Sequence, residues 1–358
     1  MFKNCNNYIK KLFTRNKKNK KNNIIYSRVY SSNSDSNKEV NNYVSDINLN
    51  KYTFKKLLFN SSSGKILLVS DDKNNEIILK LVLKHKSWFN EVTTLKILNH
   101  NHIIKIMDNH SINLTIDDND LINSGININS TSNINYIYNV IPLKYYKNGD
   151  LYDLLVKNNY FSESVSRFFL KPILEALVYS YKNNITHNDV KLENILINDN
   201  LDPILCDWGY SKKKITNKLS NNMSGTIGYM SPEMVSTKLH DLHKSNAWSF
   251  GITLFSFCFG CRPYTEPEKR YQDEEWLGEW LLAIKNKEWD KYWSSHIKNN
   301  KKFSNISPEL KNLFENIFIY DFNDRYGLED ILNHEWMNIE NENVKTLTNE
   351  EVRSKILI

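Results

Sequence analysis

Strand-like and helix-like patterns lie in separate halves of this 358-residue chain, and that separation limits the folds open to it. Apolar and β-branched runs bounded by polar turn formers predict strands, and these runs cover 65–70, 76–84, 103–112 and 136–143. Apolar residues at helical spacing predict helices, and these segments cover 88–100, 166–184, 247–261 and 307–318. Strands followed by helices favour the α+β class. We therefore expect a small β-rich lobe, a larger helical lobe, and a cleft between them.

Composition divides the chain into three parts. A basic, Asn-rich tail covers residues 1–50, a globular region covers 51–338, and a short tail covers 339–358. Within the globular region, about residues 113–134 form a polar, low-complexity stretch. Such a stretch cannot bury enough apolar surface to offset its conformational entropy, so we expect an inserted surface loop there.

The formal charge of +6 is unevenly distributed. Residues 1–34 hold nine of the 47 Lys and Arg residues and no acidic residue, and the other 38 basic residues face 41 acidic ones. The globular region is therefore about neutral, and no basic face interleaved with aromatic residues follows from its sequence. We expect no direct nucleic-acid binding by this region.

The N-terminal tail resembles a mitochondrial presequence. Phe2, Cys5, Ile9 and Leu12 fall on one helical face with lysines elsewhere, and "RVYSS" at 28–32 resembles a site cut by the matrix processing peptidase. A presequence would end at about residue 30. The alternative is a solvated basic tail or nuclear signal, which would leave the protein in the cytoplasm or the nucleus.

The cysteines and apolar runs favour a soluble protein in a reducing compartment. Four cysteines are too few for a disulfide framework in a chain of this length. Cys258 and Cys261 lie in the apolar run 247–261, where burial explains them. That run is shorter than the roughly 20 apolar residues of a membrane span, so we expect no transmembrane segment.

The segment 186–210, "THNDVKLENILINDNLDPILCDWGY", carries the side chains that phosphoryl transfer requires. The reaction needs a carboxylate to accept the proton of the attacking hydroxyl, oxygen ligands for metal ions, and cations that offset the charge of the transferring group. Asp189, Lys191, Asn194 and Asp207 supply those groups.

"HNDVKLEN" and "DWG" resemble the catalytic loop and the metal-binding motif of eukaryotic protein kinases. The resemblance implies that Asp189 is the catalytic base, Lys191 contacts phosphate, and Asn194 and Asp207 bind Mg²⁺. It extends over about residues 52–338 with motifs in the family's order, so 51–338 is identified as a kinase domain. It implies the bilobal kinase fold, with ATP and Mg²⁺ as cofactors.

Further matches place the remaining motifs. Lys80 in "IILK" matches the lysine that holds the α and β phosphates, and Glu91 matches its helix partner. "SGTIGYMSPE" is similar to the substrate-binding segment, with Thr226 in place, and "NAWSFG" is similar to the buried helix that anchors the lobe. Arg325 in "DFNDR" matches the arginine that pairs with Glu233 of that segment.

Substrate type follows from fewer residues. Lys191 together with Thr226 resembles the serine/threonine branch of the family, so the implied partner is a protein that presents a Ser or Thr hydroxyl. Glu193 resembles the glutamate that pairs with a substrate arginine in basophilic members, such as the calcium/calmodulin and AMP-activated kinases, although it would equally suit a solvated loop.

The nucleotide pocket departs from the family pattern. The glycine-rich loop reads "FNSSSG", in which Phe59 and Ser61 stand where the first two glycines belong. Without those glycines the backbone cannot approach phosphates as closely. Ile78 replaces a small alanine and adds methyl groups to the pocket. The residues that we expect to line the ATP site are Lys80, Glu91, Gly64, Ile66, Ile78, Lys144, Tyr146 and Leu196, with Leu143 as gatekeeper.

Two further departures concern activation. Asn188 stands in place of the arginine that clamps a phosphorylated residue, and Asn222 occupies the usual phosphosite. Both halves of that clamp are missing, so we expect activity without activation-loop phosphorylation, with Ser220, Ser224 and Thr216 as less usual alternative phosphosites. Asn246 replaces the buried aspartate that accepts hydrogen bonds from the catalytic loop, which predicts a less firmly held loop.

The sequence therefore predicts an ATP- and magnesium-dependent serine/threonine protein kinase. The alternative is a pseudokinase scaffold with weak or no ATP binding, which the altered glycine-rich loop and Ile78 favour.

Overall fold

The computed structural model describes most of the chain after residue 51. The described ranges are 52–61, 64–83, 85–107, 115–123, 136–213, 219–221, 223–236, 239–264, 279–299, 303, 305–339 and 347–357. The N-terminal tail, with its predicted presequence, lies outside them, as does Asn222. The chain divides into units Met1–Asp46 and Ile47–Ile358, and everything below concerns the second.

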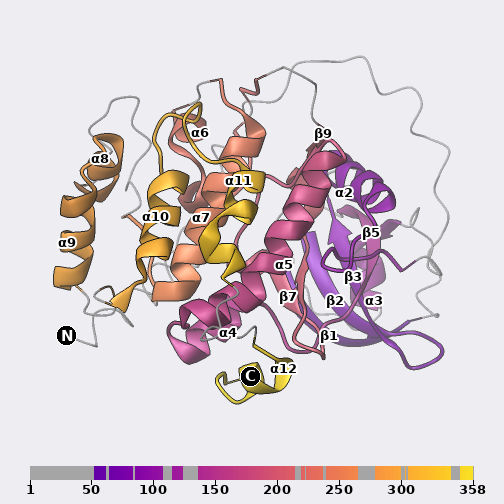
Figure 1. Ribbon diagram of the computed structural model, residues 1–358. Coiled ribbons are helices and arrows are strands. Elements are labelled where there is room, and N and C mark those ends of the chain that lie inside the picture. The colour runs from indigo at the N-terminus through magenta and orange to yellow at the C-terminus, as the bar shows by residue number, and fades with distance from the viewer. Residues whose placement is uncertain are drawn as a thin grey trace. The chain divides into compact units, whose positions relative to one another are not determined.

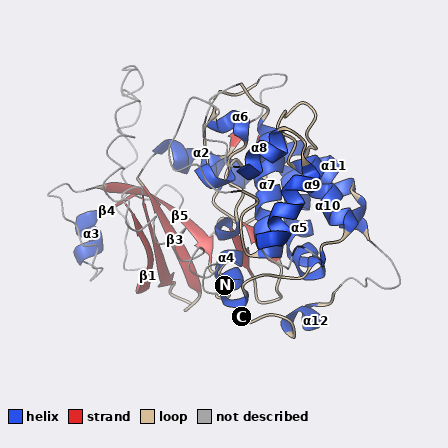
Figure 2. Ribbon diagram, turned by 90° about the vertical axis from the view of Figure 1, so that its left-hand side faces the viewer, coloured by secondary structure: helices blue, strands red, loops and turns tan. Residues whose placement is uncertain are grey.

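The N-terminal part of this unit is a five-stranded antiparallel sheet in the order β1-β2-β3-β5-β4. Its strands are β1 (Thr53–Ser61), β2 (Gly64–Ser70), β3 (Glu76–Val82), β4 (Thr115–Asp117) and β5 (Ile137–Lys144). Helix α2 (His85–Ile97) follows β3, and α3 (Asp118–Asn123) follows β4. Figure 2 shows the sheet beside the helical part, as the separated sequence patterns predicted.

The helical part contains most of the longer helices. In chain order the helices, labelled in Figure 1, are α4 (Leu151–Asn158), α5 (Glu163–Lys182), α6 (Pro232–Val235), α7 (Leu242–Phe259), α8 (Glu279–Lys285), α9 (Trp289–Asn299), α10 (Pro308–Ile317), α11 (Leu328–Asn333) and α12 (Asn349–Arg353). Between α5 and α6 lie four short strands, which form the antiparallel pairs β6–β9 and β7–β8: β6 (Ile185–Thr186), β7 (Ile195–Ile197), β8 (Pro203–Leu205) and β9 (Lys212–Lys213). Single 3-10 turns are η3 (Leu192–Asn194), η4 (Trp208–Tyr210), η5 (Ile227–Tyr229) and η8 (Glu335–Asn338).

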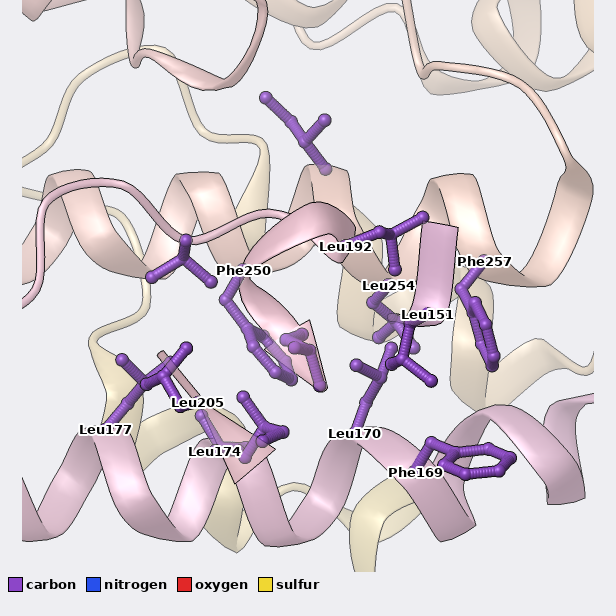
Figure 3. Packing of buried hydrophobic residues seen from close by; sticks show 14 of the residues in the cluster. Leu151, Phe169, Leu170, Leu174, Leu177, Leu192, Leu205, Phe250, Leu254 and Phe257 are labelled. Atoms are coloured by element: carbon purple, nitrogen blue, oxygen red, sulfur yellow. The ribbon is translucent and has the colours of Figure 1, made fainter. Parts of the chain in front are cut away.

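Helices α5 and α7 form the centre of the helical core (Figure 3). Helix α7 is apolar on nearly every face, which suits a helix surrounded by protein. A Cβ on Gly251 would lie 2.3 Å from Ile317 Cγ2, so glycine permits the close approach of α7 and α10. Leu192 of η3 and Leu205 of β8 pack into the same core, which fixes the segment 186–210 against it.

Two local predictions were wrong. Residues 103–107 do not form a strand, because their isoleucines are buried in the core and only Ile103 and Ile106 make isolated bridges. Part of the predicted loop 113–134 is ordered, since β4 and α3 occupy 115–123 and bury Ile116 and Leu121 against the sheet. Residues 124–135 lie outside the described part.

A buried ion pair holds this insertion to the sheet. Lys65 Nζ donates to Tyr138 Oη at 2.6 Å and lies 3.7 Å from the Asp118 carboxylate. Burial is the main reason that the pKa of Lys65 is lowered, with Asp118 acting against it. The contact between Asp118 of α3 and Lys65 of β2 therefore joins the inserted segment to the sheet.

No helix in the described ranges is both long enough and apolar enough to cross a membrane.

Candidate active site

Lys80 lies between two carboxylates that come from different elements. Its Nζ is 2.7 Å from Glu91 Oε2 on α2 and 2.7 Å from Asp207 Oδ1, which follows β8. Glu91 is fully buried. Alternation along β3 turns Lys80 and Ile78 to one face of the sheet, opposite the buried Ile77 and Leu79. The helix and the segment after β8 thus meet at a single ammonium group.

The ion pairs among Lys80, Glu91 and Asp207 determine the protonation states of Lys80 and Asp207. Burial alone would lower the pKa of Lys80, but the Asp207 and Glu91 charges outweigh it and raise this pKa. Burial alone would raise the pKa of Asp207, but the Lys80 charge and hydrogen bond outweigh it and lower this pKa to about 2. Asp207 is therefore ionised at neutral pH and able to bind a cation.

Asp189 is the centre of a second hydrogen-bonded group. Thr226 Oγ1 donates to its Oδ1 at 2.7 Å, Lys191 Nζ donates to its Oδ2 at 2.7 Å, and Asn194 Nδ2 donates to the same Oδ2 at 3.1 Å. Lys191 Nζ also donates to Thr226 Oγ1 at 2.7 Å. The carboxylate is nearly inaccessible, with 2% of the side chain exposed. A substrate hydroxyl would have to take the place of the Thr226 hydroxyl.

The ring of His187 contacts the backbone of both Asp189 and Cys206. Its Nε2 lies 3.0 Å from Cys206 O, and its Nδ1 accepts from the Asp189 N–H at 3.2 Å. Burial lowers the pKa of His187, so the ring is neutral with its proton on Nε2. The ring also packs edge-on against Trp208 at 4.6 Å between centroids. The catalytic loop and the segment around Asp207 are thus joined by one histidine.

The predicted nucleotide residues on β2 and β3 lie on one face of the sheet. In the strand register Ile66 pairs with Lys80, and Ile78 pairs with Leu143. Leu143 is buried at the end of β5, directly before the exposed Lys144. Ile78, Leu196 and Tyr146 are partly buried and pack against the core cluster. The extra methyl groups of Ile78 therefore lie on the same face of the sheet as Lys80.

Gly64 has a structural role in addition to its predicted place in the glycine-rich loop. It pairs with Ser61 across the β1–β2 hairpin and with Val82 of β3. A Cβ at this position would lie 2.3 Å from Leu81 O, so only glycine permits the strand pairing. The two residues at the tip of the hairpin lie outside the described ranges.

The predicted substrate segment lies against the catalytic loop. Tyr229 Oη donates to Glu193 Oε2 at 3.3 Å, so Glu193 is not merely solvated. Arg325 and Glu233 form a buried bidentate pair with N–O distances of 2.7 and 2.9 Å. That pair fixes the end of the segment that carries Thr226.

Sequence analysis missed Asp150, which caps α4 beside Leu196 of β7. Its side chain accepts from the Asp153 N–H at 2.8 Å, and its backbone bridges to Leu196. Burial, followed by the negative charges of Asp153 and Glu193, raises the pKa of Asp150 to about 7. The sequence "NGD" before a helix indicated a cap, but no sequence signal indicated the nearby Glu193.

The pKa of Cys206 is raised mainly by burial and also by the Asp207 charge. Its thiol is therefore protonated at neutral pH, which favours simple packing over a reactive thiol.

Comparison with known proteins gives a consistent result. The model of the protein kinase domain family matches residues 52–337. Similar curated proteins include serine/threonine-protein kinase SRK2A of Physcomitrium patens, 30% identical over 198 residues that cover 55% of this chain and 53% of the relative. They also include SRK2E of Arabidopsis thaliana, 29% identical with 55% and 51% covered, and SAPK2 of Oryza sativa subsp. indica, 27% identical with 55% of each covered. The chain spans about half the length of the curated relatives it matches.

The family match covers both the sheet and the helical part, and the motif order agrees with it. The predicted bilobal fold is confirmed, whereas the narrower resemblance to calcium/calmodulin and AMP-activated kinases stays a prediction. The chain belongs to the protein kinase family.

Proposed function

We propose that this protein is a serine/threonine protein kinase that transfers the γ-phosphoryl group of ATP to a protein hydroxyl. The observation that carries the proposal is the pair of groups around Lys80 and Asp189. Lys80 is held 2.7 Å from both Glu91 and Asp207, while Asp189 is held by Lys191 and by Thr226. Each side chain with a direct role in phosphoryl transfer is therefore present and oriented by partners.

Asp189 would accept the proton of the substrate hydroxyl. Thr226 Oγ1 already donates a hydrogen bond to Asp189 Oδ1, which makes that oxygen the acceptor for an incoming hydroxyl. Lys191 carries a positive charge beside the same carboxylate and would offset charge on the transferring group. Lys80 would hold the α and β phosphates after exchanging its contact with Asp207 for one with ATP.

Asn194 and Asp207 suit magnesium. Asp207 is ionised, and Asn194 uses its Nδ2 toward Asp189, which leaves its amide oxygen for a metal. In the described part of the chain no group of three His, Cys, Asp or Glu side chains could hold a metal. Mg²⁺ commonly takes only one or two protein ligands and completes its shell with phosphates and waters. When bound, it would neutralise the charge of the phosphates.

The substrate would be a protein that presents serine or threonine. Lys191 and Thr226 together support this class, and the names of the similar proteins agree with it. Glu193 is positioned by Tyr229 and would accept an arginine of the substrate. The direct test uses γ-labelled ATP with peptide mixtures that have a central serine, threonine or tyrosine. Label should enter the serine and threonine mixtures and not the tyrosine mixture; labelling of tyrosine alone would overturn the assignment.

We infer that activity does not require phosphorylation of the activation segment. Asn188 carries no charge with which to bind a phosphate. Its amide nitrogen donates to Tyr210 O at 3.0 Å. Ser220 is tied to His240 by backbone hydrogen bonds of 2.8 and 2.9 Å, which gives the segment a second anchor.

A pseudokinase scaffold is the second candidate, because Ile78 lies on the same face of the sheet as Lys80, where its methyl groups would crowd a nucleotide, and two loop glycines are replaced. Thermal melting separates the two candidates. In a working kinase, millimolar ATP with magnesium raises the melting temperature of the wild type, and this rise is lost in Asp207→Ala. In a scaffold, ATP with magnesium leaves the melting temperature unchanged.

We propose a mitochondrial location from the sequence of the N-terminal tail. Its apolar face, its lysines and the "RVYSS" sequence suit import and cleavage, and the alternatives are the cytoplasm and the nucleus.

A further inference from the structure

Two buried asparagines, 58 residues apart, form a reciprocal hydrogen-bonded pair next to the catalytic base. Asn246 Oδ1 on α7 accepts from the Asn188 N–H at 2.9 Å. Asn246 Nδ2 donates to Asn188 Oδ1 at 2.9 Å and also to Leu242 O at 2.6 Å. The side-chain amide of Asn246 thus bonds both the backbone N–H and the side-chain oxygen of Asn188.

Asn188 joins three segments around Asp189. Its φ of 66° lies in the left-handed region, which asparagine tolerates better than most residues. Its Nδ2 donates to Tyr210 O, just after the Asp207 motif, at 3.0 Å. A Cβ on Gly225 would lie 2.3 Å from Asn188 O, so the activation segment packs directly on its backbone. Helix α7, the segment after Asp207 and the activation segment therefore meet at Asn188.

The pair contains no net charge, which distinguishes it from an arginine–phosphate or carboxylate anchor. A buried amide pair whose groups are all bonded is stable without a counter-ion, whereas removal of one member leaves a buried N–H or C=O without a partner. The backbone N–H at risk belongs to Asn188, the residue before Asp189.

We propose that Asn188 and Asn246 act as one positioning pair that sets the place of Asp189 and holds the Tyr210 carbonyl without phosphorylation. This deepens the proposed function and rests on it, because it explains how the catalytic loop is held when the arginine clamp is absent. Neither residue touches the reacting atoms; both act through the backbone on either side of Asp189.

The pair makes an unusual prediction for Asn246→Asp, which restores the residue that the family usually has there. The carboxylate keeps an oxygen for the Asn188 N–H, but its second oxygen faces Asn188 Oδ1 and Leu242 O, which are both acceptors. Oxygen atoms that face each other repel, so this substitution should harm the chain although it restores the family pattern.

The test is a cycle of variants in the full chain: Asn246→Ala, Asn188→Gly and the double variant. Glycine at 188 removes the side chain while permitting a positive φ. With γ-labelled ATP and the serine/threonine peptide mixture, each single variant should lower kcat by about 10- to 100-fold with the KM for ATP within about threefold, because a displaced base slows the chemical step more than binding.

The kcat of the double variant should lie within about threefold of the kcat of the less active single variant, because the two side chains form one unit. Asn158→Ala is the matched control. Asn158 also bridges backbone groups with its amide, at 2.9 Å from Leu154 O and 3.1 Å from Leu357 O, but it lies at the end of α4. Its kcat should equal that of the wild type. Single effects that multiply in the double variant, or an Asn246→Asp protein as active as the wild type, would overturn the proposal.

Amide hydrogen exchange separates the failure of this proposal from the failure of the kinase assignment. The Asn188 N–H should exchange at least about tenfold faster in Asn246→Ala than in the wild type and the Asn158→Ala control, since it loses its buried acceptor. If the wild type transfers no phosphate, the kinase assignment fails while exchange still decides on the pair. If Asn246→Ala does not fold, Asn246→Leu, which keeps a similar shape and removes the acceptor, gives the same comparison, and unchanged exchange of the Asn188 N–H in that variant refutes the pair.

Discussion

Asp150 provides a quantitative test of the electrostatics around Glu193. The carboxyl group caps α4 and is partly buried, and its pKa is raised from 3.8 to about 7 by burial and by the charges of Asp153 and Glu193. Above pH 7 the folded protein holds an ionised carboxylate in an unfavourable place. We therefore predict that Asp150→Asn stabilises the protein at alkaline pH.

The sign and size follow from proton linkage. Because the folded pKa is above the unfolded value, the contribution of Asp150 to stability is fully present below about pH 4 and is lost as the pH rises through about 7. A shift of about three units at about 1.4 kcal/mol each corresponds to about 4 kcal/mol. Since the carboxylate keeps some hydration, we expect about 2–4 kcal/mol, or about 4–8 °C at roughly 2 °C per kcal/mol.

The assay is thermal melting of wild type and Asp150→Asn at pH 4 and pH 8. Asparagine caps helices as well as aspartate does, so only the charge is removed. The melting temperatures should be equal at pH 4, and the variant should be higher by about 4–8 °C at pH 8. Asp241→Asn is the control, because Asp241 caps α7 by accepting from the His243 N–H at 2.7 Å. This substitution should not raise the melting temperature at either pH. A variant no more stable than wild type at pH 8, or equally stabilised at both pH values, would refute this account.

Four other predictions concern the pocket, the ion pair, activation and the tail. Ile78→Ala should lower the KM for ATP in steady-state assays and lower stability by about 2 kcal/mol, since it removes methyl groups from a partly buried side chain; an unchanged KM would show that Ile78 does not crowd the nucleotide. Lys80→Met should abolish label transfer and lower the free energy of unfolding by about 3–5 kcal/mol in denaturant melts, because it leaves the buried Glu91 carboxylate without its cation; full stability would contradict the pairing. Phosphatase treatment should leave the transfer rate unchanged, and a large fall would show that a phosphosite controls activity. N-terminal sequencing of protein from cells should begin at Ser31 or Ser32 if the tail is an imported presequence, whereas an intact Met1 in a cytosolic fraction would exclude import.

The sequence predicted the fold because two independent signals agreed. Strand patterns precede helical patterns, and the kinase motifs occur in order along nearly the whole globular region. The errors arose where individual side chains outweighed local composition. Leu121 and Ile116 are buried within a polar stretch, and the isoleucines of 103–107 are buried in the core instead of pairing in a sheet.

The site divides in a similar way. Spacing and motif order predicted the residues around Lys80 and Asp189, and the structure brings both groups together, although their roles stay a prediction. The raised pKa of Asp150 depends on Glu193, which lies far along the chain. Each departure at Asn188 and Asn246 was visible in the sequence, but their direct pairing depends on tertiary structure. The structure shows that neutral amides hold this loop, whereas the expectation that they hold it less firmly than an aspartate stays a prediction.

The most direct test of the central claim compares label transfer and nucleotide binding in wild type and Asp189→Asn. Asp189 makes no hydrogen bond to Lys80 or Asp207. Asn194 Nδ2 also donates to the backbone Asp189 O at 2.8 Å, a bond that Asp189→Asn keeps, so the variant should bind ATP with magnesium about as tightly as wild type. Its single-turnover rate of γ-phosphoryl transfer to the serine/threonine peptide mixture should fall by about 10²–10⁴-fold, which is the usual contribution of a general base. Equal rates in the two proteins, or no transfer by the wild type despite tight binding, would contradict the assignment of this protein as a kinase.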